Sequence, residues 1–168
     1  MNSFEQLHAM EVTVPEAIGV QVRSTVGSNP EEIGPAMGAA MGTLLGYIGQ
    51  HGLQCVGAPR CVYLEYGPEG TTFLTAMPVA APPLDAGTGP VSVGPLPSGE
   101  AFRFTHTGPY PQIGATYHLI TDYMRGKGLM ESEADWMKYM PMWEEYLNDP
   151  ATTPEAELVT HIYLPIAR

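Results

Sequence analysis

Residues 35–53, PAMGAAMGTLLGYIGQHGL, decide the fold, because a related stretch, PQIGATYHLITDYMRGKGL, follows 76 residues later at 111–129. One offset without gaps pairs six identical residues: Pro35 with Pro111, Gly38 with Gly114, Ala39 with Ala115, Tyr47 with Tyr123, Gly52 with Gly128 and Leu53 with Leu129. An internal repeat of this size predicts two similar units that pack together. The seam between them is where a pocket would form.

The similarity extends into the flanking sequence, with small changes in loop length. Further identical pairs are Arg23 with Arg103, Thr25 with Thr105, Glu65 with Glu145 and Tyr66 with Tyr146. We therefore expect one domain over residues 1–168, with repeat one at about 10–80 and repeat two at about 91–168. A chain of this length suits two half-domains that share one core better than two independent domains.

Acidic residues dominate the charge, since 18 Asp and Glu oppose 7 Lys and Arg for a net charge of −11. Such a surface repels nucleic-acid phosphates, so we expect no direct nucleic-acid binding, whereas it favours cationic ligands. No stretch approaches the roughly 20 apolar residues that a membrane span needs, and MNSFEQLHAM at the N-terminus lacks the pattern of a signal peptide. The sequence predicts a cytoplasmic protein with no membrane partner.

The metal-ligating residue types show no ligand spacing. Cys55 and Cys61 are too few for a disulfide scaffold and have no second pair of cysteines at metal-ligand spacing. The histidines are His8, His51, His106, His118 and His161. No phosphate loop, nucleotide fingerprint or Ser-His-Asp order is present either. We expect neither a metal nor a cofactor.

Cap and turn residues divide repeat one into its elements. Asn29 as N-cap, followed by Pro30 at the first helical position, predicts a helix that Gly49 and Gly52 end. The cluster Gly67-Pro68-Glu69-Gly70 is typical of a turn and predicts a hairpin. The strands of this repeat are expected over residues 11–25, 61–66 and 72–79.

Repeat two follows the same plan after a linker at residues 80–90. Its elements are expected as strands over 91–96, 101–107, 142–147 and 158–165, a helix over 111–125 and a short helix over 131–140. The sequence therefore predicts the α+β class, as a tandem β-α-β-β repeat with pseudo-two-fold symmetry. An antiparallel-rich sheet would carry the two long helices on one face.

Glycines recur every fourth residue in the first helix, at Gly34, Gly38, Gly42 and Gly46. Each costs up to about 1 kcal/mol relative to alanine in helix propensity, which indicates that something must approach closely. Packing against another helix is one explanation. Room for a bound ligand is the other.

The segment MPMWEEYLNDP, residues 140–150, carries the strongest local signal for a site. In a strand, Glu144 and Tyr146 share one face, while Trp143, Glu145 and Leu147 share the other. One glutamate must then face the helices, where a carboxylate is costly unless it is protonated, hydrogen-bonded or matched by a cation. Such a glutamate among aromatic rings is a receptor for an external cation. In the alternative, this is an edge strand and both glutamates are solvated.

Four blocks together resemble a known family. They are His106-Thr-Gly-Pro-Tyr110, Lys127-Gly-Leu129, Trp143-Glu-Glu-Tyr-Leu-Asn-Asp-Pro150 and Val159-Thr-His-Ile-Tyr-Leu-Pro-Ile166. Their order and spacing resemble the GyrI-like small-molecule-binding family, which includes the effector-binding domains of multidrug-responsive transcription regulators. The resemblance implies a tandem fold with an aromatic-lined ligand cleft between the halves. It also implies that Glu144 is the cation-binding or reaction-centre carboxylate, with Tyr146 and Tyr110 at the motif's tyrosine positions.

Two features depart from the family pattern. Its ending usually reads T-E-I-x-x-P, but here His161 replaces the acid, which removes a second carboxylate. In addition, no segment resembles a helix-turn-helix, so we expect a stand-alone module.

Nine residues are candidates for ligand contact. They are Glu144, Tyr146, Tyr110, Trp143, Tyr117, Phe104, Tyr63, Trp136 and His161. If the protein is an enzyme, Glu144 and Tyr146 are the candidate catalytic residues. His106 and His161 could instead supply acid-base help or simply satisfy backbone partners.

Three functions compete. The first is binding or sequestration of an apolar, cationic or amine-bearing drug-like compound. The second function is hydrolysis. Some proteins similar to this family hydrolyse cyclopropane-bearing electrophilic natural products, and here Glu144 would be the general base. The third function is that of a gyrase-inhibitor-like module, which would regulate a protein partner through its acidic surface. A homodimer is also compatible with the sequence.

Overall fold

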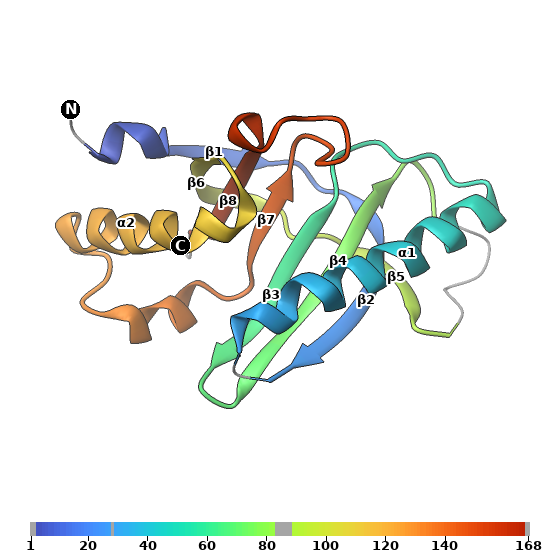
Figure 1. The fold of residues 1–168 in the computed structure, drawn as a ribbon, viewed down its shortest axis with the longest axis horizontal. Helices are drawn as coiled ribbons and strands as arrows, with labels where there is room; N and C mark the ends of the chain where they lie inside the picture. Colours follow the sequence, from blue (N-terminus) through green and yellow to red (C-terminus); the bar gives the residue numbers. More distant parts are fainter. Residues whose placement is uncertain (1–2, 28, 83–88, 167–168) are drawn as a thin grey trace.

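One antiparallel sheet of eight strands carries two α-helices in this computed structural model, which describes residues 3–27, 29–82 and 89–166. The helices are α1, Ile33–His51, and α2, Ile113–Gly126, at the right and left of Figure 1. The strands are β1 Met10–Val14, β2 Ile18–Val26, β3 Arg60–Gly67, β4 Gly70–Val79, β5 Val91–Pro95, β6 Gly99–Thr107, β7 Met142–Tyr146 and β8 Val159–Pro165. No helix of the described residues is long and apolar enough to cross a membrane.

Short 3-10 helices complete the secondary structure. They are η1 Ser3–Leu7, η2 Pro30–Glu32, η3 Tyr110–Gln112, η4 Glu133–Tyr139 and η5 Glu155–Glu157. The expected short helix at 131–140 is therefore η4. Of the expected linker at 80–90, residues 83–88 lie outside the described residues.

The strand order is β1-β6-β8-β7-β3-β4-β2-β5, so the two halves meet where β7 pairs with β3. The halves also exchange strands, because β1 pairs with β6 and β5 pairs with β2. The α+β class is confirmed. The single strand expected over 11–25 is wrong, since the chain leaves the sheet after Val14 and re-enters at Ile18. Pro15, which has no N–H to donate to a ladder, lies at this break.

Both helices lie on one face of the sheet, as predicted. Directly paired residues share a face, and one row of them crosses seven strands as Phe104, Ile162, Glu144, Cys61, Thr75, Val22 and Val91. At one end of the row, Phe104 belongs to a hydrophobic cluster with Ile120 of α2. Near the other end, Val22 belongs to a cluster with Leu44 of α1. Glu144 therefore lies between the two helix-covered clusters.

The helix boundaries follow their cap residues. The side-chain oxygen of Asn29 accepts a hydrogen bond from the backbone N–H of Glu31 at 3.0 Å, at the start of η2 and thus one turn before α1. Gly52 follows the last residue of α1 with φ 62°, a left-handed conformation that favours glycine. Gly128 adopts φ 73° at the equivalent place after α2, which explains why this glycine recurs in both repeats.

The glycines of α1 do not pack against another helix. Gly34, Gly38, Gly42 and Gly46 are exposed, and a Cβ added to any of them would meet no described atom within 4 Å. The opposite side of the helix, with Leu44, is the one that packs on the sheet. The helix-packing explanation of these glycines is therefore wrong, and room for a ligand stays a prediction.

Candidate ligand-binding site

Glu144 lies at the centre of the sheet on the face that carries the helices. Its strand, β7, is flanked by β8 and β3, which place Ile162 and Cys61 directly beside it. The residue is only 4% exposed. Of the two alternatives left open by the sequence, the central strand with an inward glutamate is the one present, because neither β7 edge is free.

Tyrosine hydroxyls surround the carboxyl group of Glu144. Tyr146, two residues along the same strand, donates to Oε1 at 2.6 Å, and Tyr117 of α2 donates to Oε2. Tyr63 of β3 contributes a further side-chain hydrogen bond. The carboxyl group is thus held by donors from a helix and two strands, which fix its position between the two halves.

Burial and hydrogen bonding act on Glu144 in opposite directions. Burial raises the pKa of its carboxyl group, and the hydrogen bonds from the three tyrosines only partly offset this. Burial, followed by the charge of Glu144, also raises the pKa of Tyr63, Tyr117 and Tyr146 well above the usual value. The tyrosines therefore remain neutral donors, and no ion pair joins Glu144 to a described lysine, arginine or histidine.

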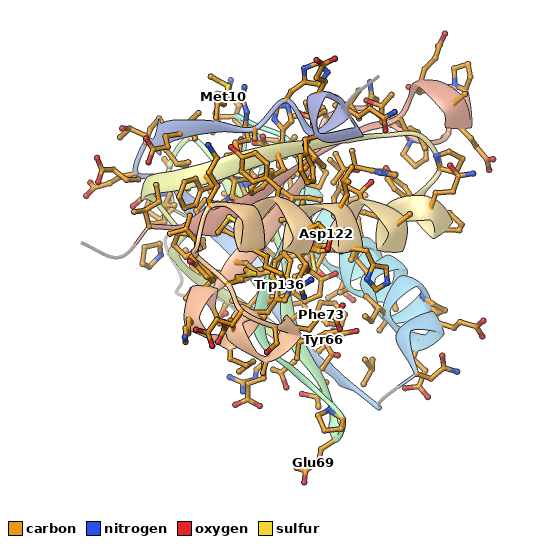
Figure 2. All side chains as sticks on the ribbon, turned by 90° about the vertical axis from the view of Figure 1, so that its left-hand side faces the viewer. Met10, Tyr66, Glu69, Phe73, Asp122 and Trp136 are labelled. Carbon is orange, nitrogen blue, oxygen red and sulfur yellow. The ribbon has the colours of Figure 1, made fainter. Side chains whose placement is uncertain are left out.

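Further aromatic rings contact Tyr117 and Tyr146. The ring of Trp136, in η4, meets that of Tyr117 edge to face with centroids 5.4 Å apart. The indole N–H of Trp136 donates to the hydroxyl of Thr121 at 2.9 Å, which ties η4 to α2, and Figure 2 shows Trp136 below that helix. On the other side, Tyr110 meets Tyr146 edge to face at 5.6 Å.

The structure brings most of the candidate residues together and separates three. Those gathered around the carboxyl group are Glu144, Tyr146, Tyr117, Tyr63, Tyr110 and Trp136. Trp143 and His161 point to the other face of the sheet. Trp143 is adjacent to Glu144 in β7, and His161 pairs with Glu145, so both alternate with Glu144. Phe104 is on the helix face but completely buried in the core beneath α2.

The other face of the sheet holds a separate polar group. Glu145 accepts a hydrogen bond from Tyr163 at 3.0 Å, and its carboxylate is 3.6 Å from Nδ1 of His161 and 4.0 Å from Nε of Arg60. His161 is the first cause of the lowered pKa of Glu145. Trp143 stacks on Tyr163 beside this group, with centroids 5.0 Å apart. Two adjacent glutamates thus have pKa values displaced in opposite directions.

His106 holds a turn in place. Its Nδ1 is 2.6 Å from the hydroxyl of Thr116, and its Nε2 is 3.1 Å from the carbonyl oxygen of Pro109. With both ring nitrogens engaged, this buried histidine connects the end of β6 to the first turns of α2. Nowhere in the described parts of the chain do three or more His, Cys, Asp or Glu side chains converge to hold a metal ion.

Sequence reasoning missed Cys61 and Thr121. Cys61 lies directly opposite Glu144, and burial, followed by the charge of Glu144, raises the pKa of its thiol. The alternation of the hairpin places Cys61 and Tyr63 on one face, but only the pairing of β3 with β7 brings that face to Glu144. Thr121 is one turn from Tyr117 on α2, and no sequence signal indicated its bond to Trp136.

A family model described as the GyrI-like small molecule binding domain matches residues 67–167. No curated protein matches the chain significantly. Among solved structures, the C-terminal domain of EcmrR is similar over 95% of this chain and 97% of its own, with a TM-score of 0.68 and 20% identity. In its complex with DNA, the EcmrR chain is longer, and 98% of this chain spans 59% of it at a TM-score of 0.68 and 19% identity.

Two further structures share the fold. SAV2435, solved with tetraphenylphosphonium bound, is similar over 95% of this chain and 93% of its own, with a TM-score of 0.63 and 13% identity. A hydrolase from Listeria innocua is similar over 95% of this chain and 91% of its own, with a TM-score of 0.59 and 15% identity. Similarity at these identities establishes the arrangement of helices and strands.

Proposed function

This chain belongs to the GyrI-like small-molecule-binding domain family, and from that premise we propose that Glu144 and its tyrosines bind an apolar cation or amine. The observation that carries the proposal is the carboxyl group of Glu144, which is buried without any cationic partner among the described residues. Buried charges are normally paired, and an external cation would supply the missing partner.

Aromatic rings make the surroundings suitable for an apolar cation. Tyr117, Tyr146 and Trp136 present aromatic rings, whose faces attract positive charge and whose apolar surface excludes water. A diffuse cation, with its charge shielded by carbon, loses little hydration on entering such a site. SAV2435, which has the same fold, was solved with the lipophilic cation tetraphenylphosphonium bound.

A single carboxylate sets the charge of the preferred ligand. Glu145 lies on the opposite face of the sheet beside His161, so its carboxylate adds no negative charge to the Glu144 site. We therefore expect a preference for one positive charge over two. The net charge of −11 favours the approach of such cations.

Two probes of nearly equal shape and opposite charge test the proposal. Isothermal titration calorimetry should show that tetraphenylphosphonium binds, whereas tetraphenylborate does not. Substitution Glu144→Gln should weaken tetraphenylphosphonium at least tenfold, and Glu145→Gln, the matched control on the other face, should leave its affinity within about twofold. Equal affinity of the wild type and Glu144→Gln for the cation would refute a role for this carboxylate.

Hydrolysis is the second candidate, because the raised pKa of Glu144 also suits a general base. In this case Glu144 would accept a proton from water as the water attacks an electrophilic ring, and Tyr146 would orient the carboxylate. The Listeria innocua hydrolase with this fold adds support. A cyclopropane-bearing electrophile incubated with a tenth of its molar amount of protein distinguishes the two functions by mass spectrometry. Complete conversion to the water adduct, lost in Glu144→Gln, would establish an enzyme, whereas intact compound would leave binding alone.

A further inference from the structure

A groove of about 570 Å³ lies outside the Glu144 site, along the outer end of β6. Its walls come from η1 and His8 on one side and from the first turns of α2 on the other. Residues that line it include Gln6, His8, Thr105, Thr107, Gln112 and Leu119. None of its lining residues is a lysine, arginine, aspartate or glutamate, although the chain as a whole is strongly acidic.

The floor of this groove is a stretch of β6 that η1 contacts but that pairs with no described strand on the side of β1 beyond Arg103. β1 pairs with β6 only from Gly99 to Arg103, whereas β8 pairs with β6 as far as Thr107. Bonds from the Ile166 N–H to the Glu100 carbonyl and from the Gly108 N–H to the Leu158 carbonyl show that even-numbered residues of β6 bond to β8. Because the direction alternates along a strand, the odd-numbered residues point toward the line of β1.

Thr105 and Thr107 therefore direct their backbone N–H and C=O groups into the groove. Neither residue shares a backbone hydrogen bond with any described residue on that side. The chain that would have continued β1 forms η1 instead, which contacts β6 and α2 without pairing as a strand. His8 adopts φ 44°, an unusual value for a residue other than glycine, and its N–H bonds to the carbonyl oxygen of Glu5 at 3.2 Å. Leu7, which is buried in the core beneath α2, anchors this turn.

We propose that this groove binds an extended, uncharged peptide segment of a partner protein, which adds to β6 as a strand in line with β1. Four backbone groups, two each on Thr105 and Thr107, are presented where such a segment would pair, and main-chain bonding of this kind is an established mode of peptide recognition. The site continues the existing ladder between β1 and β6. The groove is bounded by η1 on one side and by α2 on the other, so we expect it to admit a single extended chain rather than the edge of another folded sheet.

The sides of the groove specify the pattern of the segment. A residue opposite His106 would point to the helix-covered face, toward Ala115 and Leu119 of α2, and should be small and apolar. Its two neighbours would point away from α2 and be polar. The absence of charged groups among the lining residues disfavours charged side chains at all three positions.

A fluorescein-labelled peptide, acetyl-Thr-Thr-Val-Thr-Thr-amide, is the probe. Amide hydrogen exchange followed by NMR should show Thr105 and Thr107 exchanging rapidly in the free protein and at least tenfold more slowly with the peptide bound. Phe104 and His106, whose amides bond to β8, are internal controls that should be protected in both states. Protection of Thr105 and Thr107 in the free protein would overturn the proposal, as would no change on saturation with the peptide.

Thr105→Pro removes the free N–H without removing a bond of the native sheet, because proline is tolerated where a strand edge is unpaired. Fluorescence anisotropy should show peptide affinity at least tenfold weaker in this variant. If Thr105→Pro misfolds, Ala115→Arg, on the exposed wall of the groove, should weaken binding equally. Ala39→Arg, the exposed equivalent in repeat one, is its matched control and should have no effect.

Competition separates this groove from the Glu144 site. Saturating tetraphenylphosphonium should leave peptide affinity unchanged, so the inference stands or falls independently of the proposed cation site. If the cation displaces the peptide and Ala115→Arg does not weaken it, the peptide binds at Glu144 and the groove is not a docking site.

Discussion

Glu144 should make cation binding depend on pH. Its pKa is raised in the folded protein, so the folded state holds the proton more tightly than the unfolded chain does. The fold is then relatively more stable below the unfolded pKa, and this stability is lost as pH rises through the folded pKa. A bound cation requires the carboxylate, so its affinity should increase over the same interval. Calorimetric titrations from pH 4 upward, in two buffers of different ionisation enthalpy, should show proton release that disappears in Glu144→Gln. Affinity that is flat with pH would contradict this assignment.

Tyr117→Phe should move the pH dependence upward. The hydroxyl of Tyr117 donates to Glu144 and lowers the pKa of its carboxyl group, so its removal leaves burial less opposed. The midpoint of the affinity curve should rise, and affinity near neutral pH should fall by roughly 1 kcal/mol, the usual net value of a hydrogen bond. Tyr123→Phe, on the same helix and packed against Phe104, is the control. An identical shift in both variants would mean that the effect is not local to the carboxyl group.

At the scale of elements, the hydrogen bond between η4 and α2 should affect both the stability of the protein and the retention of ligand at the Glu144 site. Thr121→Val removes the acceptor for Trp136 and should lower the free energy of unfolding by about 1 kcal/mol, or about 2–4 °C in Tm. Because Trp136 packs against Tyr117, tetraphenylphosphonium should also dissociate faster, which stopped-flow fluorescence measures.

A matched control for Thr121→Val exists on the other helix. Each threonine hydroxyl donates a hydrogen bond to the carbonyl oxygen four residues earlier. Thr121 donates to Tyr117 at 3.1 Å, and Thr43 of α1 donates to Ala39 at 3.2 Å, but Thr43 is exposed. Thr43→Val should leave the dissociation rate unchanged. Dissociation from Thr121→Val at the wild-type rate would show that η4 does not hold the ligand.

Elements with strong local signals could be predicted from sequence, and their pairing could not. The hairpin of β3 and β4 follows from its turn at 67–70, and the end of α1 follows from Gly52, since both depend on neighbouring residues. The path of β1 depends on the other half of the chain. No residue near Met10–Val14 indicates that this segment pairs with β6, so the sequence predicts one long strand over 11–25 instead.

The candidate site shows the same division. Alternation along β7 places Glu144 and Tyr146 on one face, and this needs only the sequence of the strand. The same rule places Trp143 on the opposite face, but its aromatic character made it a candidate regardless. His161 is opposite Glu145 because β8 pairs with β7 in a particular register, which depends on contacts distant in sequence. Cys61 was missed for the same reason.

The whole molecule is one sheet whose edge strands are exchanged between the halves, so neither half should fold alone. Residues 1–82 would contain β2, β3 and β4 but lose β5, and their β1 would have no β6 to pair with. In residues 89–168, β6 would lose its pairing with β1. The first fragment would expose the edge of β3 and the second the edge of β7, which pair at the centre of the intact sheet. Unpaired edges and open apolar faces favour aggregation over independent folding.

The two fragments mixed together should recover what each lacks. Each restores an edge strand and the central pairing to the other, so we expect a one-to-one complex with the circular dichroism spectrum of the intact chain. Tetraphenylphosphonium should bind only to the mixture, because Tyr63 comes from the first fragment and Glu144 from the second. A fragment 89–168 that folds cooperatively and binds the cation alone would show that the site needs only repeat two, even though the sheet spans both. Thermal unfolding of the fragments, separately and mixed, distinguishes these outcomes.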